Sequence, residues 1–283
     1  MAKIFIRLVT PIGLWAHIID FAAWNGKGAR KCGFWYTIRM KMHIFALVSL
    51  ASIGLTASGA AETATNLSLR AERFQPVHTQ VETAELEGRT VLRVVKKDKI
   101  DLPDENTYAA WKGLKFRNGI IEARLRSRLL PNAPSYARGF IGIVYRAADD
   151  GSEFESFYVR PTNGRNCTDP VRKAHGCQYF AYPGYTFSYF REFGFRQYEA
   201  SVDVALDEWF TLKAVIQDEK AVFYLNDSPV LTVPEMKHGK GRTGAFGIYV
   251  DVGTEAFVSD LRVTPLDDPE AVRGAQSQPF RDR

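Results

Sequence analysis

Short strand-like segments, separated by turn sequences, recur along most of this chain and constrain its fold more than any other feature. Ile120–Arg126 alternates apolar residues with Glu and Arg, which is typical of a strand with one buried face. Turn sequences such as Asp149-Asp150-Gly151 divide these segments, and no stretch has a long 3.6-residue apolar period. We therefore predict an all-β fold, an antiparallel β-sandwich or jelly roll.

The predicted strands follow one another at close intervals, and the first two form a hairpin around Gly88-Arg89. They are Val81–Leu86, Val91–Val95, Ile120–Arg126, Phe140–Tyr145, Phe154–Val159, Tyr198–Val204, Trp209–Ile216, Ala221–Leu225, Val230–Val233, Ala245–Val250 and Ala256–Val263.

Residues 40–61 have the layout of a secretory signal peptide. A short basic start precedes an uncharged apolar run, Ile44–Leu55, and small residues then fit a cleavage site after Ala60 or Ala61. Because a signal peptide normally begins at the start codon, residues 1–39 are interpreted as an over-extended start. We expect a periplasmic or secreted protein with one folded domain over residues 62–266 and a flexible polar tail over residues 267–283.

A membrane helix is the alternative interpretation of the first segment. The span Ile4–Ala23 is long enough, but Arg7, Pro11, His17 and Asp20 interrupt it. The mature form is therefore predicted to have no membrane span.

The basic balance of the chain comes from its N-terminal part. Residues 1–61 hold seven of the 37 Lys and Arg but one of the 32 Asp and Glu, so the remaining chain has a net charge of −1. Nothing in that balance favours DNA, RNA or an anionic membrane surface as a partner. The roughly 220 remaining residues suit a single domain, and nothing in the sequence indicates its oligomeric state.

Two of the three cysteines lie in the predicted mature chain. Cys32 falls in the N-terminal segment, whereas Cys167 and Cys177 form an even pair in an exported protein. We therefore predict a Cys167–Cys177 disulfide. A metal site made of these cysteines and His175 would lack a fourth ligand and a zinc-like spacing, so no metal site is predicted.

A polar segment followed by an aromatic tract contains the candidate ligand-binding residues. From Gln178 to Tyr198, ten of twenty-one residues are Tyr or Phe. Aromatic faces cover the apolar side of a sugar ring, while Arg, Asn and Gln satisfy its hydroxyl groups. The candidates are Arg160, Asn163, Arg165, Arg172, Gln178, Tyr179, Tyr182 and Tyr185. The alternative is that the arginines pair with acids of their own loop, such as Asp169, and that the rings belong to the core.

Glu155 and His175 are the candidate catalytic residues. A carboxyl group can act as general acid or base in glycosidic cleavage, and a histidine can act as a base near neutral pH. Glu153 lies two residues before Glu155 and would share its strand face. The alternative is that both glutamates face solvent beside a turn and that His175 is an ordinary loop residue. Tyr185, Phe187 and Tyr189 alternate, so they are predicted to share a face as well.

Four C-terminal segments resemble concanavalin A-like lectin/glucanase jelly rolls. They are Trp209–Ile216, Ala221–Asp227, Gly244–Val250 and Thr254–Val263. The likeness is greatest to the bacterial 3-keto-disaccharide hydrolase or family 16-like glycoside hydrolase domains. Phe157–Arg165, with the later His175, Gln178, Tyr179 and Tyr182, is similar to exported members of that group. The resemblance covers about residues 75–265 and implies the fold, which serves lectins, hydrolases and silent modules alike.

The glucanase motif itself is incomplete. Retaining enzymes of that fold carry Glu-x-Asp-x-x-Glu on one strand, whereas the nearest stretch here runs from Glu153 through Glu155 to Tyr158 and lacks the last acid. Phosphate-loop, nucleophile-elbow, zincin and EF-hand motifs are also absent from the sequence. No cofactor is predicted, although a structural calcium ion would be compatible with the resemblance.

The sequence thus predicts an exported carbohydrate-active protein that cleaves a glycosidic bond in an oligosaccharide or keto-sugar glycoside. Two alternatives stay open. The first is a non-catalytic carbohydrate-binding module that uses the same face, and the second is a structural envelope protein without a ligand.

Overall fold

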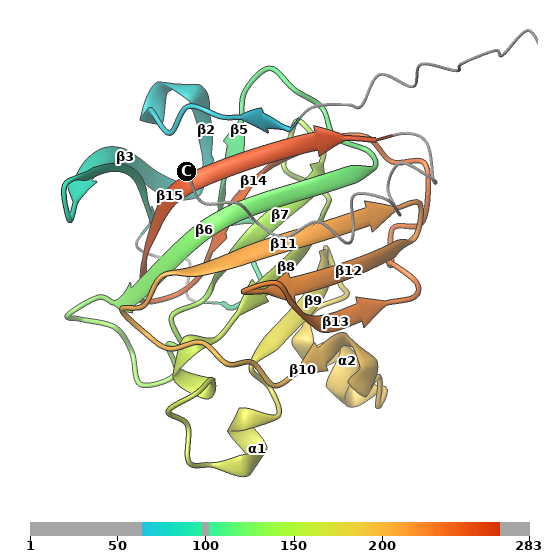
Figure 1. The fold of residues 1–283 in the computed structure, drawn as a ribbon. Helices are drawn as coiled ribbons and strands as arrows, with labels where there is room; N and C mark the ends of the chain where they lie inside the picture. The colour runs from blue at the N-terminus through green and yellow to red at the C-terminus, as the bar shows by residue number, and fades with distance from the viewer. Residues whose placement is uncertain (1–63, 98–101, 267–283) are drawn as a thin grey trace, which may run out of the picture. The chain divides into compact units, whose positions relative to one another are not determined.

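Two antiparallel β-sheets stack on each other in the computed structural model, which describes residues 64–97 and 102–266 (Figure 1). Sheet A has the strand order β13-β12-β11-β6-β15-β4-β3, with β1 paired to β15, and sheet B has the order β10-β9-β8-β7-β14-β5-β2. Every strand pair in both sheets is antiparallel. The fold is an all-β antiparallel sandwich, as the sequence predicted.

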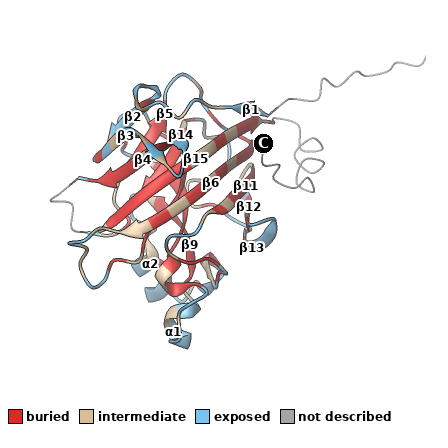
Figure 2. Cartoon of the chain, turned by 60° about the vertical axis from the view of Figure 1, so that its left-hand side comes forward, coloured by how far each residue is buried: buried red, intermediate tan, exposed pale blue. Residues whose placement is uncertain are grey.

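Sheet A contains the longest strands of the described chain. Its members are β1 (Thr65–Asn66), β3 (Thr79–Leu86), β4 (Arg89–Lys96), β6 (Gly119–Leu129), β11 (Phe210–Gln217), β12 (Lys220–Leu225), β13 (Ser228–Val233) and β15 (Thr254–Pro265). Figure 2 shows buried residues along β6 and β15, at the centre of the sheet, and exposed residues on the edge strand β13.

The strands β8 and β9 of sheet B, with the connections that follow them, carry the predicted site. Its members are β2 (Phe74–Val77), β5 (Tyr108–Trp111), β7 (Ile141–Ala147), β8 (Phe154–Val159), β9 (Cys177–Tyr182), β10 (Glu199–Ala200) and β14 (Ala245–Val250). Five short helical segments lie in the connections: η1 (Ala71–Arg73), η2 (Pro161–Asn163), α1 (Pro170–Lys173), α2 (Phe187–Glu192) and η3 (Arg196–Tyr198).

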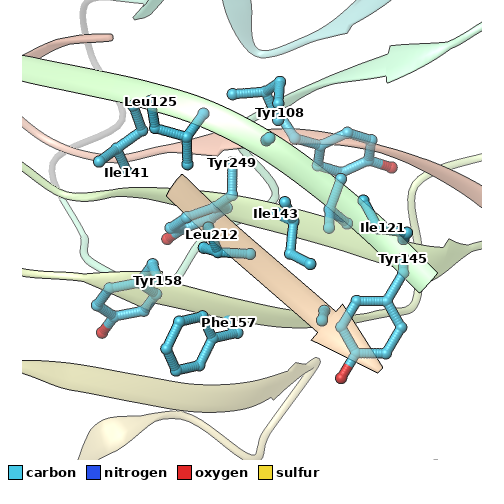
Figure 3. Packing of buried hydrophobic residues seen from close by; sticks show 14 of the residues in the cluster. Tyr108, Ile121, Leu125, Ile141, Ile143, Tyr145, Phe157, Tyr158, Leu212 and Tyr249 are labelled. Carbon is cyan, nitrogen blue, oxygen red and sulfur yellow. The ribbon is translucent and has the colours of Figure 1, made fainter. Parts of the chain in front are cut away.

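Apolar side chains from the facing sides of the two sheets form the core. Phe157 of β8 stacks on Phe223 of β12, with ring centroids 4.2 Å apart. Figure 3 shows Leu212 of β11 in the same buried cluster as Ile143 and Phe157 of sheet B. All four side chains are fully buried. Burial of apolar area of this kind is the main favourable contribution to folding.

The predicted hairpin and eight of the other predicted strands are present, with the same ends or with small shifts of their ends. Tyr198–Val204 is wrong, because only Glu199–Ala200 pairs in a sheet and Tyr198 ends a 3-10 helix. The predicted shared face of Tyr185, Phe187 and Tyr189 is also wrong. Phe187–Glu192 forms the helix α2, which places Phe190 rather than alternate residues in the interior.

Strands β2, β5 and β9 were not predicted. Tyr108–Trp111 and most of Cys177–Tyr182 are buried on both faces, so neither segment shows the alternation that identifies a half-buried strand. Pro76 interrupts the pattern of β2, an edge strand that tolerates proline.

The predicted over-extended start, signal peptide and tail lie outside the described residues. Within the described ranges, no helix has the length and apolarity needed to cross a membrane.

Candidate functional site

The register between β8 and β9 separates the predicted site into two parts. Phe154 pairs with Tyr182 at one end of the two strands, and Val159 pairs with Cys177 at the other. Five residues of extended strand span about 16 Å. The polar candidates that follow Val159 and the tyrosines that follow Ala181 therefore lie at opposite ends of sheet B, and the structure does not bring them together.

Arg160 lies in the interior at the end where Val159 pairs with Cys177. It is 4% exposed and donates hydrogen bonds to Tyr158 Oη (2.8 Å), Gln178 Oε1 (3.3 Å), His175 O (3.2 Å) and Glu199 Oε1 (3.1 Å). A buried guanidinium requires such partners because desolvation of an unpaired charge is costly. All the described bonds of Arg160 are internal to the fold, and so are those of the buried Gln178, whose amide also donates to Tyr179 O (2.8 Å).

Glu199 compensates the charge of Arg160 and also contacts Arg191 and His175. Arg191 donates to both of its carboxylate oxygens, at 2.6 and 3.0 Å, and His175 Nδ1 lies 2.8 Å from Oε2. That histidine contact has the distance of an ion pair but does not form a hydrogen bond. Burial by itself would raise the pKa of Glu199. The hydrogen bonds and ion pairs with Arg191 and Arg160 have the larger effect, so the pKa of Glu199 is below its usual range.

Asn163 and Arg172 do come together, whereas Arg165 turns away. Asn163 Oδ1 accepts from Arg172 Nε and Nη2 at 3.2 and 3.1 Å, and Asn163 Nδ2 donates to His175 O. Arg165 pairs with Asp203 and Glu208 on the surface, at 2.7 and 2.6 Å. The acids that neutralise Arg165 thus come from the segment before β11, and not from Asp169, which caps α1.

Glu155 is on the face of sheet B that packs against sheet A. It pairs with Tyr145, whose ring lies near Phe223 of β12, and its side chain is fully buried. Tyr179 Oη donates to Glu155 Oε2, and the backbone N–H of His238 donates to Oε1 at 3.0 Å. Burial raises the pKa of Glu155 despite these bonds. No contact joins it to His175, which lies by Glu199, and Tyr179 is part of the core.

The outer face of sheet B is covered as well. Asp104 Oδ1 accepts from Tyr158 Oη at 2.7 Å, and Asp104 Oδ2 accepts from the backbone N–H of Phe187 at 2.8 Å. Asp251, at the end of β14, accepts from Lys96 Nζ (2.6 Å) and from the Asp104 N–H (2.9 Å). These groups are buried, except for Phe187, which is half-buried. The centre of this face is therefore closed by the 102–107 loop and the start of α2.

Tyr182 and Tyr185 are the half-exposed tyrosines of the predicted site. The Tyr182 ring stacks on Phe154 with an interplanar angle of 10° and centroids 5.2 Å apart. The His238 ring bonds Tyr182 O through Nε2 at 2.7 Å and meets the Tyr185 ring edge to face.

An ion pair continues this surface. Arg242 donates to His238 O at 3.2 Å and to the Glu153 carboxylate. Burial, followed by the nearby charge of Glu105, raises the pKa of the Tyr182 hydroxyl. We call Glu153, Tyr182, Tyr185, His238 and Arg242 the aromatic rim.

Sequence reasoning missed His238, Arg242, Asp104 and Glu199. The first two lie in the connection between β13 and β14, which is rich in charged residues and longer than a tight turn. That length was the one available signal, because functional residues are often found on long loops. For Asp104 and Glu199, no local pattern distinguished them from ordinary surface acids.

The predicted disulfide is a further correction, since Cys167 and Cys177 are both free thiols. Cys177 is buried in β9, and burial raises its pKa to about 12. Cys167 is half-buried, and its Sγ lies 3.5 Å from Asp169 O. Cys167 Sγ thus contacts the residue that caps α1.

In the part of the chain that the structure describes, no group of three or more His, Cys, Asp or Glu side chains is placed to hold a metal ion.

No protein-family model matches the chain, and no curated protein sequence is similar to it. Solved structures match over most of their length at low identity. A carbohydrate-binding module from Bacillus subtilis has a TM-score of 0.46 and 12% identity, over 67% of this chain and 93% of that one. A protein of unknown function with a galectin-like fold, also from Bacillus subtilis, has a TM-score of 0.44 and 12% identity, over 69% and 92%.

A prokaryotic β-1,3-1,4-glucanase (lichenase) derived from a mouse hindgut metagenome has a TM-score of 0.40 and 9% identity, over 72% of this chain and all of that one. Because these TM-scores and identities are low, the assignment of the fold is based on the strand order of the two sheets. That fold, a sandwich of two antiparallel sheets, is the one that the resemblance to concanavalin A-like jelly rolls implied.

Proposed function

We propose that this protein binds carbohydrate at the aromatic rim, without catalysing a reaction through Glu155. The observation that carries the proposal is the half-exposed Tyr182 ring, which stacks on Phe154 with His238 and Tyr185 beside it. A ring supported from below loses little conformational freedom when a sugar stacks on it. The polar groups of Glu153 and Arg242 border the ring and can bond sugar hydroxyls, a combination that small-ligand sites commonly use.

Binding is favoured over the predicted cleavage because the predicted acid is inaccessible. Glu155 has no exposed surface, and its two oxygens accept hydrogen bonds from Tyr179 and His238. A general acid must come within hydrogen-bond reach of the glycosidic oxygen. Glu155 could do so only if the segment that contains His238 moved away.

Cleavage of a glycosidic bond is the second candidate, with other acids. Glu153 pairs with Arg242 in the aromatic rim, and the charge of Glu105 acts on the Tyr182 hydroxyl. A pair of carboxyl groups that flanks the sugar is the usual requirement of glycosidases. In this case Glu153→Gln would abolish release of reducing sugar and retain binding, because the lost interaction acts in the transition state. If the protein only binds sugar, neither the wild type nor any variant releases reducing sugar.

We also propose that the protein is exported, with cleavage after Ala60 or Ala61. The support is the order of a basic start, an apolar run and small residues over residues 40–61.

Screening the purified protein on a glycan array, followed by calorimetric titration of a sugar that binds, tests the main proposal. Tyr182→Ala should lower affinity about tenfold, which corresponds to about 1.4 kcal/mol, while Tyr182→Phe should retain most of it. Tyr136 is the matched control, because it is 48% exposed on the connection between β6 and β7. If Tyr136→Ala and Tyr182→Ala bind the sugar equally well, the rim is not the site.

A further inference from the structure

Two arginines near α1 have no carboxylate partner. Arg172 is half-buried and bonds Asn163 Oδ1 and Thr162 Oγ1 (3.4 Å), and Arg138 is half-buried and bonds Ser135 O and Ala137 O at 2.7 and 2.8 Å. Among the described residues, neither guanidinium forms an ion pair, and Arg172 Nη1 and Arg138 Nη2 have no hydrogen bond. Both groups thus keep donors that a ligand could use.

The two arginines lie on neighbouring segments. The backbone N–H of Thr162 donates to Arg138 O at 3.3 Å, and the Thr162 hydroxyl accepts from Arg172 Nη2. The connection after β6, which contains Arg138, and the segment with α1 extend from the same end of the sandwich (Figure 1). Thr162 therefore contacts one arginine from each segment.

The position of Arg172 is set by a buried partner. Asn163 is 4% exposed, and its Nδ2 donates to His175 O at 3.1 Å, so its Oδ1 is directed at Arg172. Oδ1 binds Nε and Nη2 together. This geometry holds the guanidinium plane in one orientation and leaves Nη1 to donate to an oxyanion.

At this end of sheet B, no ion pair with a described residue compensates Arg138 or Arg172, and the nearby carboxylate of Asp169 caps α1 and accepts from the Arg172 backbone N–H at 3.3 Å. Arg160 is nearby, but Glu199 compensates it while also pairing with Arg191 and His175. Burial, followed by the nearby charges of Arg172 and Arg160, lowers the pKa of Arg138. Mutual repulsion of cations is relieved when an anion binds between them.

We propose that Arg138 and Arg172 form a binding site for an oxyanion, namely a carboxylate or sulfate group, that is either free or part of an acidic sugar. The site does not depend on sugar binding at the aromatic rim. It lies at the Val159 end of β8, whereas Tyr182 lies at the Phe154 end.

Thermal unfolding with sodium sulfate, D-galacturonate and D-galactose, at constant ionic strength, tests the site. Sulfate at ten times its Kd should raise the Tm of the wild type by about 3–6 °C. Arg138→Gln and Arg172→Gln should each weaken sulfate binding at least tenfold, because each removes a charge-assisted hydrogen bond. Arg165→Gln is the matched control, since it removes the same charge from the same segment but its guanidinium already pairs with Asp203 and Glu208.

The three ligands distinguish the source of the anion. A shift with sulfate alone supports a site for free or ester sulfate, and a shift with galacturonate but not galactose supports a sugar carboxylate. Arg138→Gln removes a repulsion but also the hydrogen bonds to Ser135 O and Ala137 O, so its stability without ligand should stay near that of the wild type. Its Tm without ligand is measured beside its response to sulfate, so that a loss of binding is separated from unfolding. Tyr182→Ala should retain the sulfate shift.

The proposal is overturned if neither anion shifts the Tm, if the Arg138 and Arg172 variants respond like the wild type, or if Arg165→Gln loses as much affinity as they do. An equal response to galactose and galacturonate, without a response to sulfate, would also overturn it.

Discussion

The Tyr179 hydroxyl donates a hydrogen bond to the carboxylate of Glu155 inside the sandwich and accepts one from the backbone N–H of Lys237 at 2.6 Å. With the His238 N–H on the other oxygen of Glu155, two residues of sheet B hold the connection between β13 and β14. The same connection contains His238 and Arg242 of the aromatic rim. Glu155 therefore helps to position the aromatic rim from inside the sandwich.

Glu155→Gln should reduce stability and leave the groups that contact sugar at the aromatic rim unchanged. The amide has a single acceptor oxygen, so its NH2 group would face either the His238 N–H or the Tyr179 hydroxyl. An unsatisfied buried group costs about 1–3 kcal/mol, which corresponds to a decrease in Tm of about 2–4 °C per kcal/mol.

Urea unfolding of this variant beside Glu153→Gln provides the comparison. Glu153 is half-exposed and ion-paired with Arg242, so its loss should cost less than about 1 kcal/mol. Equal stability of the Glu155 variant and the wild type would contradict the buried role.

Asp104 should make stability depend on pH. Burial raises its pKa from 3.8 to about 6, against the opposing effects of Arg160 and of two hydrogen bonds. The folded protein thus binds this proton more tightly than the unfolded chain does. The contribution of Asp104 to the free energy of unfolding is greatest below about pH 4 and decreases by about 3 kcal/mol as the pH rises past 6.

Chemical unfolding between pH 4 and 7 of wild type, Asp104→Asn and the exposed control Asp203→Asn measures this effect. The decrease between pH 4 and 6 should disappear in Asp104→Asn alone. The same pH profile in all three proteins would show that another group is responsible.

Sequence patterns predicted the fold far better than the site, and β8 shows why. The order of strands and turns identified Phe154–Val159 with the ends that the structure has. All six residues of β8 are buried, however, so no alternation showed which face Glu155 would take. Its direction depends on pairing with Tyr145 and on contact with sheet A, which local sequence does not encode.

The same limit explains the division of the predicted site. Arg160, Gln178 and Tyr182 are close in sequence, but β8 and β9 are antiparallel, which places Arg160 and Tyr182 at opposite ends. Because β9 was not predicted as a strand, this register could not be inferred.

The two thiols should differ in reactivity. Cys177 is fully buried with a pKa of about 12, whereas Cys167 is half-buried, and a thiolate with access to solvent is required for reaction. Thiol titration of the Cys32→Ser protein should label one cysteine in the native state and two in denaturant without reductant. If no thiol reacts in denaturant, Cys167 and Cys177 are bridged after all.

Export should yield a mature chain that begins near Ala61 or Glu62. The signal layout over residues 40–61 is the reason for this prediction. N-terminal sequencing of protein recovered from the periplasm or the medium of the producing cell measures the start directly. A mature species that retains residues 1–39 would refute the prediction.

Arg160 should prove to be a residue of the fold and not of a ligand site. Arg160→Met removes the donors that Tyr158, Gln178, His175 O and Glu199 share. Breaking a buried ion pair from one side costs about 3–5 kcal/mol, although Glu199 retains Arg191. Urea unfolding should show a loss near the lower value, while the surface variant Arg165→Gln should change stability by about 0.5 kcal/mol or less.

On a sugar that binds the wild type, folded Arg160→Met should keep its affinity, because the aromatic rim is about 16 Å away along β8. If Arg160→Met has unchanged stability but loses affinity for the sugar, Arg160 is part of the binding site and the prediction is wrong.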